Sequence, residues 1–161
     1  MKRTLFVYIL LGITLSALTA CSKVVLVDQI YDTIHFEVVN AAGVDMLAPS
    51  NPNNILDKIS IEFEGTTYYC EYQTKMTTPV WYGLKLSPRP YNETGLYHLM
   101  FGEFSPSAES PTRSFLIDFG DGSEKCKVEF SIEKKGGSTT REFYFNGKKS
   151  ETALFRHTIT E

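Results

Sequence analysis

The residues with the greatest capacity for chemistry are three histidines, His35, His98 and His157. A histidine can act as a general base beside a serine and a carboxylate, or bind zinc together with a closely spaced histidine or cysteine. Each of these three stands alone in a predicted strand, without a short-spaced partner, and no nucleophile elbow accompanies them. The sequence therefore predicts solvent-facing histidines, no catalytic residue, no metal and no cofactor, while a triad assembled from distant positions stays open.

Oxygen-bearing side chains gather in the segment IDFGDGS, which contains Asp118, Asp121 and Ser123. The segment resembles a hairpin of PKD-type adhesion modules, and its oxygens are of the kind that binds Ca²⁺. A calcium site needs six or more oxygen ligands, whereas Gly120 and Gly122 suit the positive φ of a tight turn. We therefore expect a structural turn here in preference to a calcium site.

Two aromatic residues, Trp81 and Tyr91, lie on or beside predicted loops. Exposed aromatic rings stack on sugars in many glycan-binding proteins, so both are candidate glycan-binding residues. Trp81 has an alternative place in the core, because large aromatic side chains supply much of the apolar area that a small domain buries.

Cys70 and Cys126 are candidates for a disulfide bond. The period of two places Cys70 on the same face as Tyr68, and Cys126 on the same face as Val128 and Phe130. Both thiols are therefore expected to point into a sandwich, where they could meet across the core. A disulfide bond would close the loop of chain between Cys70 and Cys126 and would stabilise the fold by roughly 4 kcal/mol. The alternative is two separate buried thiols that behave as small apolar residues.

The N-terminal segment fixes where the rest of the chain is expected to work. Lys2 and Arg3 precede an apolar run, and the sequence LTAC ends at Cys21. The run is shorter than the roughly 20 residues of a membrane-spanning helix, which predicts a signal peptide over residues 1–20. The closing residues resemble a bacterial lipobox, which implies that Cys21 is lipidated and tethers residues 21–161 to a membrane.

The place of that tether is suggested by the residue that follows Cys21. Ser22 stands where an aspartate tends to hold enteric lipoproteins in the inner membrane, so this analogy favours the periplasmic face of the outer membrane. Asp32-Thr33-Ile34 resembles an acceptor for periplasmic O-glycosylation in Bacteroidota, which makes Thr33 a candidate glycan site.

The expected mature chain is acidic. Without Lys2 and Arg3, 14 basic residues face 19 acidic ones, so the net charge is −5. Nucleic acids and anionic membranes attract clustered lysine and arginine. The composition therefore argues against nucleic acid as a partner and leaves envelope proteins or glycans as the expected partners.

The elements that must position these residues are strands. Alternating or β-branched segments separated by Gly, Pro and Asn turns predict about nine strands and one short helical turn that starts at Asn51-Pro52 and ends near Lys58. The strands are expected at 34–39, 59–63, 68–72, 80–86, 96–104, 113–119, 124–132, 141–146 and 152–159. Gly102 is a candidate for a β-bulge, and Asn146-Gly147 is expected to form a turn. This pattern is typical of an all-β, immunoglobulin-like antiparallel β-sandwich of about seven to nine strands, in a single domain.

The loop AGVDMLAP follows the first strand and resembles a pattern in small Bacteroidota lipoproteins with immunoglobulin-like sandwiches, a family of unknown function. We expect Asp45 to bind backbone amides of this loop, with Met46 and Leu47 closing the end of the core. The expected function is a membrane-tethered, non-catalytic binding or structural accessory module. The alternatives are a glycan-binding lipoprotein of a polysaccharide-uptake system and a hydrolase, since a fold alone does not specify an activity.

Overall fold

The structure is a computed structural model that describes residues 31–70, 83–106 and 112–160. The lipobox with Cys21, as well as Trp81, lie outside the described residues, so the predictions made for them stay predictions. No helix within these ranges is long and apolar enough to cross a membrane.

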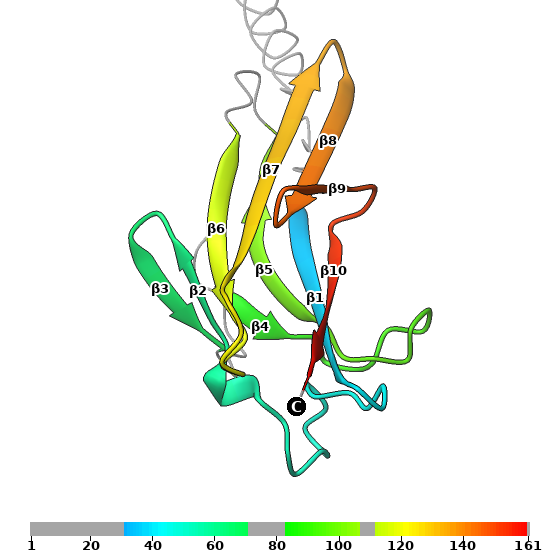
Figure 1. The fold of residues 1–161 in the computed structure, drawn as a ribbon. Coiled ribbons are helices and arrows are strands. Elements are labelled where there is room, and N and C mark those ends of the chain that lie inside the picture. Colours follow the sequence, from blue (N-terminus) through cyan, green and yellow to red (C-terminus); the bar gives the residue numbers. More distant parts are fainter. Residues whose placement is uncertain (1–30, 71–82, 107–111, 161) are drawn as a thin grey trace, which may run out of the picture.

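Ten strands and one 3-10 turn form the described fold, and the strands build two sheets (Figure 1). The four-stranded sheet has the order β10-β1-β5-β4, and the six-stranded sheet has the order β3-β2-β6-β7-β8-β9. The elements are β1 (Asp32–Asn40), η1 (Leu56–Lys58), β2 (Ser60–Phe63), β3 (Thr66–Tyr69), β4 (Leu84–Leu86), β5 (Leu99–Phe104), β6 (Arg113–Asp118), β7 (Cys126–Lys135), β8 (Ser138–Phe145), β9 (Lys148–Ser150) and β10 (Leu154–Ile159).

The core lies between the two sheets because each central strand alternates apolar and polar residues. In β1, Ile34, Phe36 and Val38 are buried, and in β7 Cys126 and Phe130 are buried. Phenylalanine rings from both sheets meet edge to face, for example Phe36 with Phe115, whose ring centres lie 6.1 Å apart. Full burial of one such side chain contributes about 1.5–3 kcal/mol, so these rings supply a large part of the stabilisation of the core.

The predicted all-β, immunoglobulin-like sandwich is confirmed, with two differences in detail. The strand β9 was not predicted, because Lys148–Ser150 is short and polar and carries no apolar alternation. The strands β1 and β10 pair in parallel, whereas the prediction was antiparallel throughout. Segments more than a hundred residues apart in sequence form this pair, and one sequence contains no signal for such pairing.

Several local predictions are confirmed. Gly102 has φ +68°, and between Phe101 and Phe104 β5 carries one residue more than β1, which is the predicted bulge. Asn146 and Gly147 both have positive φ in the turn between β8 and β9. These predictions are confirmed because the preference of glycine and asparagine for a positive φ depends on the residue itself and not on distant parts of the chain.

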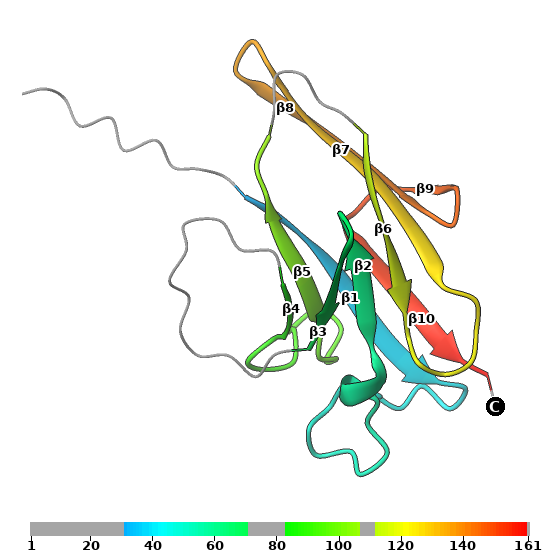
Figure 2. The same cartoon turned by 90° about the vertical axis from the view of Figure 1, so that its left-hand side faces the viewer.

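The loop after β1 also behaves as predicted. The carboxylate of Asp45 accepts a hydrogen bond from the backbone N–H of Leu47 at 2.8 Å, and Leu47 and Met46 are buried at the end of the core. The predicted helical turn is shorter than expected and begins at Leu56. In both views η1 lies at the lower end of the molecule and the hairpin of β7 and β8 lies at the upper end (Figures 1 and 2).

Candidate functional site

The outer face of the four-stranded sheet carries a buried group of charged side chains. Because Ile34, Phe36 and Val38 point into the core, His35 and Glu37 must point outward from β1. Glu37 is nevertheless 0% exposed. An outward-pointing carboxylate can be buried only if another segment covers it, and that segment is the loop between β4 and β5.

This covering loop, residues 87–98, is fixed at both ends by hydrogen bonds. The backbone N–H of Ser87 donates to the carbonyl of His98 at 2.8 Å, and the N–H of His98 donates to the Ser87 hydroxyl at 3.1 Å. A third bond joins the loop to the AGVDMLAP segment, since the N–H of Tyr97 donates to the second carboxylate oxygen of Asp45 at 2.8 Å. The loop therefore has a fixed position over β1.

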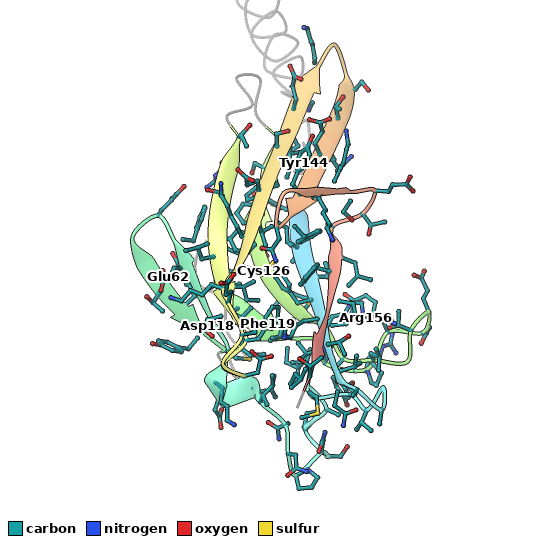
Figure 3. All side chains as sticks on the ribbon, viewed as in Figure 1. Glu62, Asp118, Phe119, Cys126, Tyr144 and Arg156 are labelled. Carbon is teal, nitrogen blue, oxygen red and sulfur yellow. The ribbon has the colours of Figure 1, made fainter. Side chains whose placement is uncertain are left out.

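Beneath the loop, Glu37 binds two cationic or protonatable groups at once. Its Oε1 lies 2.8 Å from Nε2 of His98, and its Oε2 accepts a hydrogen bond from the Arg156 guanidinium at 2.7 Å. Arg156 comes from β10 and is labelled in Figure 3. The register of β10 with β1 places it beside Glu37. We call Glu37, His98, Arg156, His35 and Tyr91 the outer-face cluster.

The surroundings of Glu37 keep it ionised. Burial alone would raise the pKa of Glu37, but hydrogen bonds from Thr94, Arg156 and His98 outweigh that effect and lower the pKa below its ordinary value. A buried carboxylate needs such partners, because an unpaired buried charge is strongly unfavourable. The ion pair therefore holds the loop, the strand β1 and the strand β10 together.

The rings of Tyr91, His98 and His35 pack in a defined arrangement. Tyr91 stacks on His98 with ring centres 3.9 Å apart and planes 9° apart. His35 is nearly perpendicular to both rings, and its centre is 5.6 Å from Tyr91 and 5.5 Å from His98. Since His35 is equally far from both stacked rings, it lies beside the stack, and it does not cover the second face of Tyr91.

His35 and His98 also approach each other through their ring nitrogens, with the two Nδ1 atoms 3.4 Å apart. Burial lowers the pKa of His35 to about 4, and electrostatic repulsion from His98 acts in the same direction. His35 is therefore a neutral imidazole at neutral pH.

This geometry differs from that of a catalytic triad. In a triad, the carboxylate binds one histidine nitrogen and the nucleophile binds the other. Here the Glu37 carboxylate and the Thr94 hydroxyl both approach Nε2 of His98, at 2.8 Å and 3.3 Å, while Nδ1 faces His35. A histidine with this arrangement orients its neighbours, but it does not relay a proton from a hydroxyl to a carboxylate.

A pocket of about 480 Å³ is lined by residues 87–93 of the covering loop. Tyr91 is both a wall of this pocket and the ring that stacks on His98. The pocket is thus positioned by the outer-face cluster below it. Of the two candidate glycan-binding residues, Tyr91 is placed at a pocket, and Trp81 lies outside the described residues.

A second histidine–carboxylate pair joins the two sheets near the C-terminal strand. His157 in β10 places Nε2 at 2.6 Å from Oδ2 of Asp121, and its ring stacks on Phe119 at 4.0 Å (Figure 3 labels Phe119). Oδ1 of Asp121 accepts a hydrogen bond from the N–H of Ser123. We call His157, Asp121 and Phe119 the C-terminal cluster. Burial opposes ionisation, but hydrogen bonds from His157 and Ser123 lower the pKa of Asp121 to about 2.

The interpretation of IDFGDGS as a turn agrees with the structure. Asp118 accepts a hydrogen bond from the N–H of Gly120, and Gly120 and Gly122 both have positive φ. Within the described ranges, no group of three or more His, Cys, Asp or Glu side chains has the arrangement of a metal site. Asp118 and Asp121 therefore use oxygen atoms to shape the turn.

The expected disulfide is corrected by the structure, in which Cys70 and Cys126 are not bonded to each other. Cys126 points into the core, as predicted, and burial raises the pKa of its thiol. However, Cys70 follows β3 and Cys126 begins β7, two strands of one sheet with β2 and β6 between them. Three strand spacings amount to roughly 14 Å, whereas a disulfide needs Cα atoms within about 7 Å.

The prediction of isolated, solvent-facing histidines is also wrong. His98 is 4% exposed and bound to Glu37, His35 contacts His98, and His157 contacts Asp121. Sequence reasoning missed Glu37 and Arg156 altogether. The only signal was that His35 and Glu37 share one face of a strand, and this signal says nothing about the loop that covers them. Thr33 lies half-buried in β1 and stays a candidate glycosylation site.

No family model, curated protein or solved structure matches this chain.

Proposed function

We propose that this protein is a lipid-anchored, non-catalytic binding or structural accessory module of the cell envelope, held at the periplasmic face of the outer membrane. The observation that carries the proposal is the pocket formed by residues 87–93, which the buried Glu37–His98 pair holds over a rigid sheet. A preformed pocket lowers the entropy cost of binding, because the loop does not have to be ordered by the ligand.

The chemistry of the outer-face cluster supports a non-catalytic role. The hydrogen-bonding groups of Glu37 and His98 are used inside the protein, and neither side chain lies open to the pocket. The C-terminal cluster supports the same role, because Asp121 is bound by His157 and by the backbone of its own turn. Both arrangements suit a rigid scaffold.

The lipid anchor rests on the LTAC motif and on the resemblance of the AGVDMLAP loop to small envelope lipoproteins. Growth with a clickable fatty acid tests it: the native chain is expected to become labelled, and Cys21→Ser is expected to abolish the label. Separation of inner and outer membranes, with protease applied to intact cells, tests the location. A label that persists in Cys21→Ser would contradict the proposal.

A second candidate function, glycan binding, is favoured by the ring geometry of Tyr91. One face of this ring stacks on His98, and His35 leaves the other face uncovered. An aromatic ring fixed at a pocket wall provides a flat apolar surface for a sugar ring.

Titration with polysaccharide fragments, followed by calorimetry, tests this candidate. Tyr91→Ala is expected to abolish binding, and Tyr91→Phe is expected to retain it, because stacking needs the ring and not the hydroxyl. Tyr69→Ala is a matched control, since Tyr69 is an exposed tyrosine on the other sheet. Equal binding by Tyr91→Ala and Tyr69→Ala would exclude Tyr91 as the sugar platform.

A further inference from the structure

His35, His98 and Met100 all lie on the outer face of the four-stranded sheet, close to Tyr91. The two Nδ1 atoms lie 3.4 Å apart, at the long end of hydrogen-bond distance. Two imidazole nitrogens that share one metal ion at about 2.0–2.1 Å, at trigonal to tetrahedral angles, lie roughly 3.3–3.6 Å apart. The observed separation fits two ligands of one ion.

The protonation pattern leaves both nitrogens available as ligands. Nε2 of His98 lies against the Glu37 carboxylate, so the proton of a neutral His98 belongs on Nε2 and the lone pair of Nδ1 is directed at His35. A neutral His35 with its proton on Nε2 directs a second lone pair at the same point. A carboxylate that binds the distal nitrogen of a histidine is a common outer-shell feature of metal sites, because it fixes the tautomer and the ring.

A third ligand atom is supplied by β5. Met100 lies directly opposite His35 in the antiparallel pair of β1 and β5, and it follows His98 by two residues. Its Sδ is 3.5 Å from the hydroxyl of Tyr91, whose ring stacks on His98. Met100 therefore shares the outer face of the sheet with both imidazoles, and its thioether contacts the same tyrosine that stacks on His98.

We infer that His35 Nδ1, His98 Nδ1 and the Met100 thioether form a binding site for Cu(I). Thioether and imidazole ligands together favour this soft, monovalent ion, whereas oxygen-rich sites favour hard ions such as Mg²⁺ and Ca²⁺. Tyr91 covers the site, and Glu37 orients His98 as the outer-shell carboxylate. The inference does not depend on the proposed binding function of the loop, since the ligands lie below the pocket.

Anaerobic titration with Cu(I), in competition with bathocuproine disulfonate, tests the site in the full chain in detergent. Thiolates also bind Cu(I), so the titration uses the variant Cys21→Ser, Cys70→Ser, Cys126→Ala as the background. We expect one equivalent of Cu(I) and a shift of the His35 and His98 ring signals in NMR, which the diamagnetic ion permits.

Three further variants in this background sharpen the test. His35→Gln is expected to weaken Cu(I) binding by more than the roughly 10–100-fold that loss of an outer-shell partner costs. Met100→Leu, which conserves volume, is expected to weaken it while leaving the fold unchanged. His157→Gln is the matched control and is expected to leave the affinity unchanged, because this histidine belongs to the C-terminal cluster.

Three results would overturn the inference: unchanged affinity in His35→Gln, an equal affinity for Zn²⁺, or ring shifts confined to His157. If the background variant does not fold, the same comparison in the chain with its native cysteines still decides. His35→Gln should then bind one equivalent of Cu(I) fewer than His157→Gln, and equal stoichiometry would overturn the site.

Discussion

The outer-face cluster and the C-terminal cluster both pair a buried histidine with a carboxylate, but they are built differently. Glu37 is fully buried and shared by His98 and Arg156, which come from separate segments of the chain. Asp121 sits in a tight turn that already satisfies one of its oxygens through Ser123, and His157 adds one contact. The outer-face cluster therefore depends on tertiary packing. In the C-terminal cluster, one of the two contacts of Asp121 lies within its own turn, and the other depends on tertiary packing.

Removal of Glu37 should have the largest effect on stability. In Glu37→Ala, His98 loses its carboxylate inside the protein, and breaking a buried ion pair typically costs about 3–5 kcal/mol. Urea unfolding followed by circular dichroism measures the loss. Glu129→Ala is the control, because its pair with Lys127 is partly exposed and should contribute less than about 1 kcal/mol. Similar losses in both variants would refute the structural importance of the outer-face cluster.

The turn that carries Asp121 can be broken at a glycine. A Cβ on Gly120 would lie 2.4 Å from Cβ of Lys58 and 2.7 Å from its carbonyl oxygen, and φ is +67°. Gly120→Ala should therefore cost about 2–4 kcal/mol, the sum of crowding and left-handed strain.

Gly122 provides the matched control for that substitution. It also has positive φ, +83°, but nothing lies within 4 Å of an added Cβ. Gly122→Ala should cost only about 1–2 kcal/mol, the strain alone. Thermal unfolding of the two variants compares them directly. Equal losses would show that contact between the turn and Lys58 adds nothing to the stability of the C-terminal cluster.

The C-terminal cluster should make stability depend on acid pH. The pKa of Asp121 is lowered to about 2 in the folded protein, so its contribution is fully present above the unfolded pKa near 4. It is lost as pH falls from about 4 through about 2, because protonation then removes the carboxylate that binds His157 and Ser123.

Asp121→Asn tests this dependence. The variant should be less stable than the native chain by about 1–2 kcal/mol at pH 6, with the difference disappearing near pH 2. Urea unfolding at a series of pH values measures it. A difference that is constant with pH would mean that the hydrogen bonds of the turn, and not the charge of Asp121, stabilise the cluster.

The smallest effect is expected from the Tyr91 ring. Tyr91→Leu removes the stack on His98 and should cost about 0.5–1.5 kcal/mol. The backbone N–H of Tyr91 donates to the carbonyl of Leu96 within the loop, and that of Tyr97 donates to the carboxylate of Asp45. Hydrogen exchange of both amides should accelerate in the same variant. Tyr91→Phe keeps the ring and should exchange like the native chain. No change in Tyr91→Leu would show that the backbone bonds fix the loop without the stack.

The two clusters also differ in how far the sequence predicted them. The turn at Gly120 and Gly122 was predicted because a positive φ is a property of single residues. Burial of Glu37 was not predicted, because it requires a loop some fifty residues later in the chain to fold back over β1. A charged residue on the outward face of a strand is normally exposed to water, so strand alternation predicts that Glu37 is exposed, whereas it is buried.

The sequence by itself determined the class of fold, most of the strands, the tight turns and the bulge at Gly102, since these follow from alternation and from backbone preference. It also determined that Asp45 binds the loop amides while Leu47 is buried, because both act within a few residues. Only the tertiary structure decided the parallel pairing of β1 with β10, the separation of Cys70 from Cys126, and the contacts of His98 with His35 and Glu37. Those features depend on strand order and loop placement, which long-range packing selects and no local preference encodes.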